Sequence, residues 1–225
     1  MDTAIVTGAS RGLGRALARE LIARGWRVVV DARDGEALAA EWQDEPHAVA
    51  IAGDVRERRH LESLVEAAGD PIALVVNNAS ILGPSPQPRL AAYPLAELLR
   101  VYDVNLVAPL ELVQLALPHL REGACVVSIT SDAAVEAYPG WGGYGSSKAA
   151  LDQLTAILAA ELPELRVYAV DPGDMRTQLH QEAFPGEDIS DRPEPEQSVP
   201  GLVSLIEGDR PSGRYRAADV AGVAA

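Results

Sequence analysis

The chain has 225 residues, of which 48% are hydrophobic and 23% are charged, and its formal net charge is −14 at pH 7. This length and composition indicate a single globular domain and exclude an intrinsically disordered chain. The negative charge disfavours nucleic acids and anionic membrane surfaces as partners, because both repel an acidic protein.

Short apolar segments along the chain predict strands. They lie at residues 3–7, 27–31, 47–51, 73–77, 125–130 and 166–170. Each is mostly apolar instead of alternating with polar residues, which is typical of strands buried on both faces of a parallel sheet. A further segment at 213–219 is expected to form an edge strand.

Amphipathic segments that predict helices lie between these strands. In residues 12–25, Leu13, Leu17 and Leu21 form one stripe at helical spacing, and Gly25 is a typical helix stop. Helices are also expected at 56–69, 151–162 and 201–209. This alternation predicts an α/β fold with a doubly wound parallel sheet flanked by helices on both faces.

Residues 184–200 differ from the rest of the chain because they are rich in proline and acidic residues. One interpretation is a solvated loop with short helical pieces. The other is a mobile flap over a pocket, because long irregular segments in compact domains are often lids. We expect one domain over residues 1–225, with a substrate-side flap at about 178–200.

Cys125 is the only cysteine, and its apolar surroundings predict an inert, buried thiol. The start of the sequence has no basic segment followed by a long apolar run, and no apolar stretch is long enough to cross a bilayer. We therefore expect a cytoplasmic protein without a membrane partner.

Residues 7–14, T-G-A-S-R-G-L-G, follow the first predicted strand and open the first predicted helix. Their glycines allow a sharp turn and a close approach of the backbone to a ligand. The helix N-terminus behind them favours a phosphate, because its N–H groups are unpaired and the helix dipole is positive there. Glycines at such turns also serve purely structural roles, so both interpretations stay open.

Tyr144 and Lys148 lie four residues apart near the start of a predicted helix, so their side chains share one face. A tyrosine phenol has a pKa of about 10 and is a poor proton shuttle at neutral pH. A neighbouring ammonium group is expected to lower that pKa toward the working range. The alternative is a tyrosine and a lysine that share a helix by chance.

The order of several motifs resembles the classical short-chain dehydrogenase/reductase family, from Thr3 to about Asp219. They are T-G-x-x-x-G-x-G at 7–14, G-D-V at 53–55, N-N-A-S at 77–80, Asn105, Ser131, Y-x-x-x-K at 144–148 and D-P-G-D-M-R-T at 171–177. Ser80 stands where the family usually has glycine. The resemblance implies a single Rossmann-type domain.

By this resemblance, four residues carry the chemistry. Tyr144 exchanges a proton with the oxygen of the reacting carbonyl or alcohol. Ser131 hydrogen-bonds that oxygen, and Lys148 tunes Tyr144 and holds the nicotinamide ribose. Asn105 supports a water that links Lys148 to solvent. The nicotinamide carries the hydride, so the protein supplies orientation and electrostatics.

The resemblance also implies which residues bind the dinucleotide cofactor. They are Gly8, Ser10, Arg11, Gly12, Leu13, Gly14, Arg33, Asp54, Val55, Asn78, Ala79, Tyr144, Lys148, Pro172, Gly173, Met175 and Thr177.

The end of the second predicted strand bears on the choice between NADP and NAD. Arg33 lies where NADP-preferring members of the family carry a base, and Ala32 lies where the NAD-selecting acid would sit. Arg11 adds a second cation. Asp31 points to NAD instead, because a one-residue shift would make it the selecting acid. We favour NADP(H) over NAD(H).

The resulting prediction is an NADP(H)-dependent oxidoreductase that interconverts a small carbonyl compound and a secondary alcohol by hydride transfer. One alternative is an NAD-dependent alcohol dehydrogenase of the same fold. Another is a non-catalytic protein that senses the dinucleotide. The resemblance further implies a homo-oligomer, a dimer or a tetramer, with residues 92–118 and 144–162 as candidate interface elements.

The four histidines show no metal-ligand spacing, so we expect surface or loop residues and no metal site. They are His47, His60, His119 and His180. Trp141 and Tyr138 lie between Ser131 and Tyr144 in the sequence. They are expected either to line the substrate pocket or to be packing residues.

Overall fold

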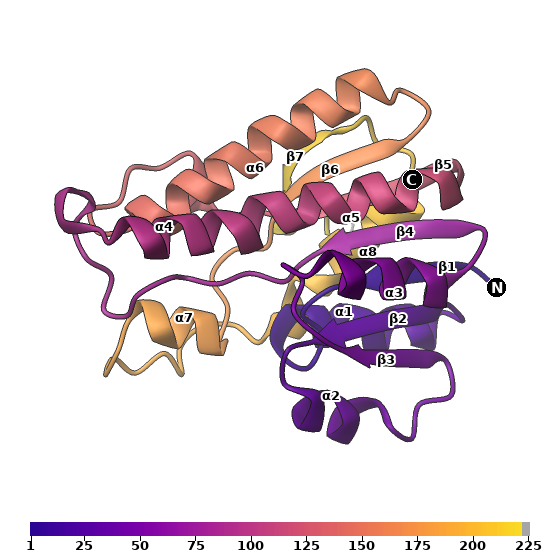
Figure 1. The fold of residues 1–225 in the computed structure, drawn as a ribbon, viewed down its shortest axis with the longest axis horizontal. Helices are drawn as coiled ribbons and strands as arrows, with labels where there is room; N and C mark the ends of the chain where they lie inside the picture. The colour runs from indigo at the N-terminus through magenta and orange to yellow at the C-terminus, as the bar shows by residue number, and fades with distance from the viewer. Residues whose placement is uncertain (222–225) are drawn as a thin grey trace.

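A parallel sheet of seven strands runs through the centre of the computed structural model, which describes residues 1–221 (Figure 1). The strand order is β3-β2-β1-β4-β5-β6-β7, and each neighbouring pair is parallel. The strands are β1 (Thr3–Val6), β2 (Arg27–Ala32), β3 (Ala48–Ala52), β4 (Ile72–Asn77), β5 (Leu120–Ile129), β6 (Arg166–Asp171) and β7 (Gly213–Arg216).

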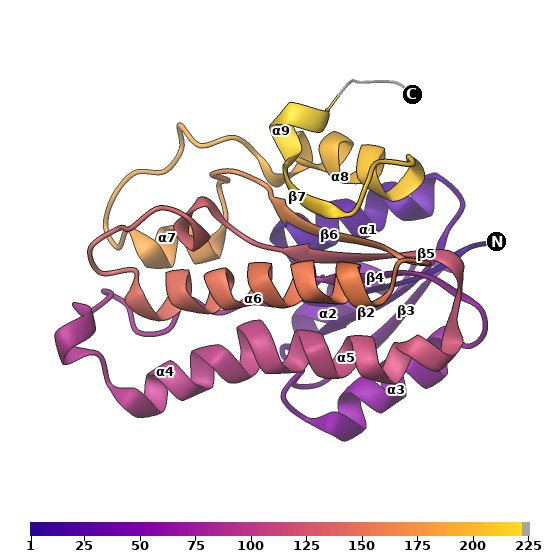
Figure 2. The same cartoon turned by 90° about the horizontal axis from the view of Figure 1, so that it is seen from above.

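Helices cover both faces of the sheet, as Figure 2 shows from above. One face carries α1 (Gly12–Ala23), α2 (Gly35–Trp42), α8 (Val199–Glu207) and α9 (Ala217–Val220). The other carries α3 (Arg58–Ala68), α5 (Ala108–Ala116) and α6 (Gly142–Glu161). Two further helices, α4 (Leu95–Tyr102) and α7 (Gln178–Ala183), lie beyond the carboxyl ends of the strands. Within residues 1–221, no helix has both the length and the apolar character that a bilayer crossing needs.

Alternate residues of each central strand pack on opposite faces of the sheet. In β2, Val28 and Val30 belong to the apolar cluster beneath α1 and α8, whereas Val29 belongs to the cluster beneath α3 and α5. Both faces are therefore buried, which explains why the strand segments are mostly apolar in sequence. The expected doubly wound α/β fold is confirmed.

The C-terminal segment 213–219 was expected to be an edge strand over its whole length, but only its first part forms a strand. Only Gly213–Arg216 is strand, and Ala217 begins the short helix α9. The side chains of Ala217 and Val220 are buried beside α8, so packing on that helix outweighs continued strand pairing.

The expected helical stretch 92–118 is helical over most of its length but is not regular. α4 passes into a π-helical turn at Asp103–Val107, which leads directly into α5. Asn105 lies inside this turn. π-helical turns inside α-helices are frequent at functional sites, because they re-aim a side chain at the cost of a regular hydrogen bond.

Cys125 is buried in β5, and burial raises the pKa of its thiol to about 12. The thiol therefore stays protonated and unreactive near neutral pH. The predicted inert core cysteine is confirmed.

Candidate active site

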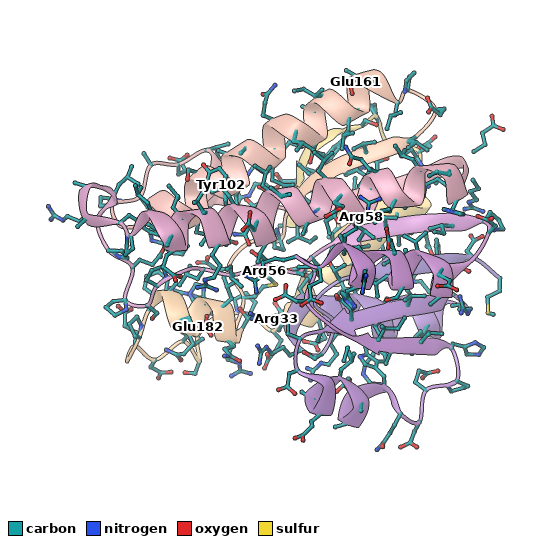
Figure 3. All side chains as sticks on the ribbon, viewed as in Figure 1. Arg33, Arg56, Arg58, Tyr102, Glu161 and Glu182 are labelled. Carbon is teal, nitrogen blue, oxygen red and sulfur yellow. The ribbon has the colours of Figure 1, made fainter. Side chains whose placement is uncertain are left out.

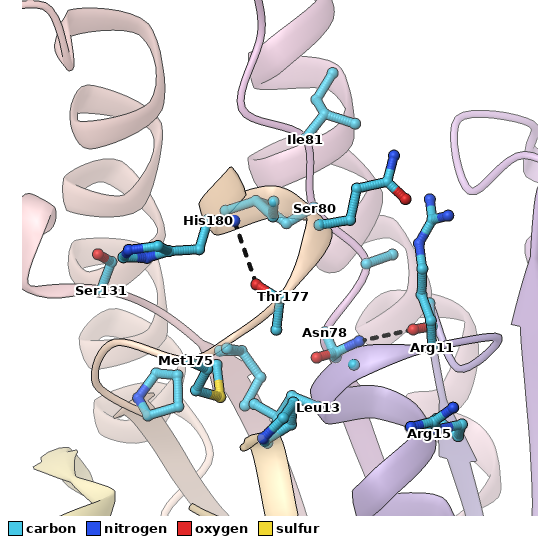
Figure 4. Close-up of a pocket in the computed structure, with 18 of the residues that line it drawn as sticks. Arg11, Leu13, Arg15, Asn78, Ser80, Ile81, Ser131, Met175, Thr177 and His180 are labelled. Atoms are coloured by element: carbon cyan, nitrogen blue, oxygen red, sulfur yellow. Dashed lines mark hydrogen bonds between the residues drawn. The ribbon is translucent and has the colours of Figure 1, made fainter. Parts of the chain in front are cut away.

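A cavity of about 720 Å³ opens at the carboxyl ends of the central strands (Figure 4). It lies where the strand order reverses, between β1 and β4, which is the usual ligand site of open α/β sheets. Loops that follow β1, β2, β3, β4, β5 and β6 all contribute to its wall. In Figure 4, Ser131 and His180 lie on one side, with Arg11 and Arg15 on the other.

Most of the residues expected at the site line this one cavity. They are Gly8, Ser10, Arg11, Gly12, Leu13, Arg33, Asp54, Val55, Asn78, Ala79, Ser131, Tyr144, Lys148, Pro172, Gly173, Met175 and Thr177. Gly14 and Asn105 are not part of the lining. Gly14 leaves space for the Gly8 carbonyl and the Asn78 side chain, and Asn105 hydrogen-bonds to Ile81 and Ser147.

The glycine turn between β1 and α1 depends on its glycines in two ways. Gly8 and Gly12 have φ values of 69° and 58°, which residues with a Cβ rarely adopt. At Gly14, a Cβ would lie 2.5 Å from the carbonyl oxygen of Gly8 and 2.5 Å from the side-chain nitrogen Nδ2 of Asn78. The turn is therefore compact, and its backbone faces the cavity directly.

This turn fits the diphosphate of a dinucleotide. The residue before α1, Arg11, makes no side-chain cap hydrogen bond, so it does not occupy the N–H groups of the first helical turn. These groups and the helix dipole favour an anion. The side chain of Asn78 braces the turn by donating to the carbonyls of Thr7 and Gly8 at 2.7 and 3.1 Å.

Several charged groups surround the end of the cavity beside β2 and β3. Arg33 is exposed and lines the cavity, together with Arg11 and Arg15. Asp54 accepts hydrogen bonds from Arg56, and this contact lowers the pKa of the Asp54 carboxyl, to which the charge of Arg33 also contributes. Figure 3 labels Arg33 and Arg56 on this side of the molecule. The local charge is thus more positive than the acidic chain as a whole suggests.

Asp31 does not present a free carboxylate to the cavity. Its side chain is 1% exposed, and its Oδ1 accepts a hydrogen bond from the Gly8 amide at 2.7 Å. Its Oδ2 lies 2.9 Å from Nε2 of His60. The strand pleat therefore turns Asp31 toward α3, and both carboxylate oxygens already have protein partners.

Tyr144 and Lys148 lie in the first two turns of α6, and both are buried, with exposures of 6% and 2%. The Lys148 ammonium donates to the Ile129 carbonyl at 2.8 Å and lies 5.5 Å from the centre of the Tyr144 ring. Burial lowers the pKa of Lys148 to about 8, although the nearby Asp152 opposes this shift. The ammonium form still predominates at neutral pH.

The pKa of Tyr144 is raised, which is opposite to the direction that we expected. Burial of the phenol is the largest cause, because desolvation disfavours the phenolate. The neighbouring Ser80 and Ser131 hydroxyls act in the other direction but do not compensate. Tyr144 is therefore a protonated phenol at neutral pH, in a position to donate its proton.

Asn105 connects the π-helical turn to the floor of the site. Its Oδ1 accepts from the Ser80 hydroxyl at 3.1 Å and from the Ile81 amide at 2.9 Å. Its Nδ2 donates to the Ile81 carbonyl and to the Ser147 hydroxyl, which in turn donates to the Tyr144 carbonyl. Asn105 thereby fixes both α6 and the loop that carries Ser80.

Ser80 and two histidines have roles that were not apparent from the sequence. Ser80 lines the cavity, and its hydroxyl lowers the pKa of Tyr144. In the sequence, Ser80 stands out only because the family usually has glycine at this position. His60 and His180 were expected at the surface or in loops, and this expectation is wrong. His60 is buried in α3, and His180 is buried in α7, where it lines the cavity.

The sequence also marks the site by its lysine content. Lys148 is the only lysine of the chain, since the other cationic side chains are arginine or histidine. Arginine is effectively always charged, whereas a buried lysine adjusts its pKa readily. Arginine occupies the other strongly basic positions of the chain, and lysine occurs only at this buried one.

Aromatic side chains gather at the Tyr144 end of the cavity. Trp141 lines it, with its ring 5.8 Å from that of Tyr144 and 6.0 Å from that of Phe184. Tyr138 is exposed and is not part of the lining, although its ring lies 6.2 Å from that of Trp141. The expected pocket-lining role thus fits Trp141 and not Tyr138. Gln178, Leu179, His180, Glu194 and Pro195 from the expected flap also line the cavity.

Comparison with known proteins places this geometry in a family. The sequence signature of the short chain dehydrogenase family matches residues 2–188. A relative from Arabidopsis thaliana, named NADPH-dependent aldehyde reductase-like protein, chloroplastic, is 31% identical over 94% of this chain and 81% of its own length. Mouse sepiapterin reductase is 33% identical over 79% of this chain and 76% of its own length.

A solved structure is similar to the whole fold. It is a short chain dehydrogenase from Escherichia coli CFT073 in complex with NADPH, with a TM-score of 0.87 and 26% identity over 96% of each chain. The family signature, the relatives and this structure agree with the cavity and the order of its residues. The chain therefore belongs to the short chain dehydrogenase family of NAD(P)-dependent oxidoreductases.

Proposed function

We propose that this protein uses NADPH to reduce a small carbonyl compound to a secondary alcohol, with Tyr144 as the proton donor. One observation carries the proposal: Ser131, Tyr144 and Lys148 line the same cavity as the glycine turn. A cofactor held by that turn and a substrate held at Tyr144 would then share one space. When bound, the nicotinamide supplies the hydride.

The cofactor is held, in this proposal, by the residues that line the cavity from the glycine turn to the loop after β6. Gly8 and Gly12 bring the backbone close to the diphosphate, and the N-terminus of α1 faces it. Asp54 and Val55 flank the adenine, and Pro172–Thr177 cover the nicotinamide. Lys148 holds the nicotinamide ribose.

Tyr144 acts as the acid of the reduction. Its raised pKa keeps the proton on the phenol at neutral pH, which is the form that a carbonyl reductase needs. The Ser131 hydroxyl donates to the carbonyl oxygen and steadies the charge that develops there. The Lys148 ammonium stabilises the phenolate that is left after proton transfer. In the oxidation of an alcohol, the same groups work in reverse.

Two local features favour NADPH over NADH. Arg33 and Arg11 are cations that line the cavity near the end of β2, where a 2′-phosphate would lie. Asp31, the acid that would favour NAD, has both oxygens engaged by Gly8 and His60. The Arabidopsis relative is named as NADPH-dependent, and the E. coli structure holds NADPH, which agrees with this preference.

A homo-oligomer is part of the proposal. Leu95 and Leu99 on α4 are 74% and 65% exposed, and Ile157 on α6 is also exposed. A second copy of the chain would cover exposed apolar side chains of this kind. A closing flap at about 178–200 and a cytoplasmic location stay predictions from the sequence.

The substitution Tyr144→Phe tests the proposed chemistry. Cofactor binding, followed by NADPH fluorescence, should change less than about threefold, because the phenyl ring stays in place. Turnover of carbonyl substrates found by screening with both cofactors should fall on the order of 10²- to 10⁴-fold, since the general acid is lost. Full activity in this variant would exclude Tyr144 as the proton donor.

Tyr168→Phe is the matched control. Tyr168 is also buried, and its hydroxyl donates to the Arg210 carbonyl at 2.6 Å, outside the cavity lining. This variant should retain its turnover even if it loses some stability. A wild-type protein that binds NADPH but turns over none of the carbonyls or alcohols screened would favour the dinucleotide-sensing alternative.

A further inference from the structure

Asp31 and His60 form a buried pair between the end of β2 and the first turn of α3. Their side chains are 1% and 5% exposed, and Oδ2 of Asp31 lies 2.9 Å from Nε2 of His60. A carboxylate without partners is costly at such burial, so this contact holds the orientation of the Asp31 side chain. His60 itself is not part of the cavity lining.

The second oxygen of Asp31 reaches the glycine turn. Oδ1 accepts from the Gly8 amide at 2.7 Å, and the backbone carbonyl of Asp31 accepts from the Ala9 amide at 2.8 Å. Gly8 and Ala9 of the turn are thus anchored to the end of β2. Asn78, which follows β4 directly, donates to the Gly8 carbonyl and anchors Gly8 from that side.

The space for the His60 ring is built into the loop after β3. A Cβ at Gly53 would overlap the imidazole, so glycine is needed at this position as long as the ring is there. The Gly53 amide donates to the Ala32 carbonyl at 3.0 Å, which ties this loop to the end of β2. The residue types at positions 31, 53 and 60 are therefore mutually dependent.

We propose that His60 is a positioning residue for the cofactor: it orients Asp31, and Asp31 in turn fixes the Gly8 amide and the glycine turn. This inference rests on the proposed function, because it assumes that the turn holds the diphosphate of the cofactor. The diphosphate is common to NADPH and NADH. Loss of the His60 contact therefore weakens both cofactors alike, whereas loss of a cation near the 2′-phosphate weakens NADPH alone.

Two substitutions of similar shape separate positioning from simple burial. In His60→Gln, the side-chain amide nitrogen lies near the place of Nε2 and can still donate to Asp31. In His60→Asn, the side chain is too short to reach the carboxylate. The matched control is His119→Asn, since His119 pairs with Asp70 at 2.8 Å on the surface, outside the cavity lining.

The readouts are the Kd values of NADPH and NADH, measured by fluorescence, and the exchange rate of the Gly8 amide proton in the cofactor-free protein. We expect His60→Asn to raise both Kd values on the order of tenfold and to speed Gly8 exchange by a similar factor. His60→Gln should stay within about threefold of the wild type, and His119→Asn should match it. Unchanged Kd values in folded His60→Asn would overturn the proposal.

A measurement on the unmodified protein covers the case in which His60→Asn does not fold. NADPH titration should shift the ring ¹⁵N resonances of His60, which is not part of the cavity lining, and leave those of His119 in place. Unmoved His60 resonances at saturation would overturn the proposal. If the wild-type protein binds neither cofactor, the proposed function itself fails, and this outcome is distinct from both others.

Discussion

The two ends of the cavity are built by different physical means. At the glycine turn, the site is formed by the backbone: glycines remove side chains, and Asn78 and Asp31 hold the amides and carbonyls. At Tyr144 and Lys148, the site is formed by burial, which shifts the pKa of each group. Steric changes should therefore damage the first end, and changes of charge or pH should affect the second.

Gly14→Ala is expected to have the largest effect on the glycine turn. The new Cβ would meet the Gly8 carbonyl and the Asn78 side chain at 2.5 Å, so the turn must shift. We expect the Kd of NADPH to rise on the order of 100-fold, from about 3 kcal/mol of strain at an overpacked position. Gly35→Ala, which also opens a helix but meets only the Ala52 methyl group at 3.1 Å, is the control. Equal losses in both variants would show that the turn is not specially constrained.

The chemical end should respond to pH through Lys148. Its pKa is lowered from 10.5 to about 8 in the folded protein, so the unfolded chain binds more protons between these values. The contribution of Lys148 to the free energy of unfolding therefore increases as the pH rises through this window. Between pH 7 and 9.5 this gain is about 2 kcal/mol.

Urea unfolding of wild type and Lys148→Met at both pH values measures this gain as a difference. Titration of Cys125 lowers the stability of both proteins alike above neutral pH, because burial raises the pKa of its thiol, so its effect cancels. From pH 7 to pH 9.5, the free energy of unfolding of the wild type should rise by about 2 kcal/mol relative to that of the methionine variant. A constant difference would mean that Lys148 titrates normally.

Arg33→Ala tests the choice of cofactor at the end of the cavity beside β2 and β3. Loss of one charge-assisted hydrogen bond to a 2′-phosphate should raise the Kd of NADPH on the order of tenfold. The Kd of NADH should stay nearly unchanged. Arg59→Ala removes the same charge from an exposed position outside the cavity lining and serves as the control. Equal weakening of both cofactors by Arg33→Ala would remove the basis for the NADPH preference.

Ser80→Gly should have the smallest effect. The Ser80 hydroxyl lowers the pKa of Tyr144, so its removal should raise that pKa further. Oxidation of an alcohol, which needs the phenolate, should slow by a few-fold at pH 8, and its pH profile should move upward. Reduction should change little, since the phenol is already protonated. A similar change in Ser204→Ala, a substitution in α8 outside the cavity lining, would show that the effect is not specific.

The sequence predicted the strands, the sheet and the glycine turn because these depend on local patterns. The mostly apolar runs and the helical stripes are visible within single segments. Segment 213–219, which is strand only over Gly213–Arg216, is too short for its hydrophobic period to distinguish a strand from a helix. There, burial of Ala217 and Val220 beside α8 decides the structure.

The pairing of Asp31 with His60 could not be predicted from the same patterns. β2 is apolar on both faces, so its sequence does not show which way Asp31 points. The face of Asp31 and the helical phase of His60 become known only when α3 packs on β2. The raised pKa of Tyr144 was missed for a related reason, because the depth of burial depends on how the loops after β4 and β5 and helix α6 close around the phenol.

The most direct test of the site uses its single lysine. Protein labelled with ¹³C-lysine should show one Cε resonance, because Lys148 is the only lysine. We expect this resonance to titrate with a pKa of about 8 and to move when NADPH is added. A pKa near the ordinary value of 10.5, with no response to NADPH, would mean that the ammonium is neither buried nor at the cofactor site.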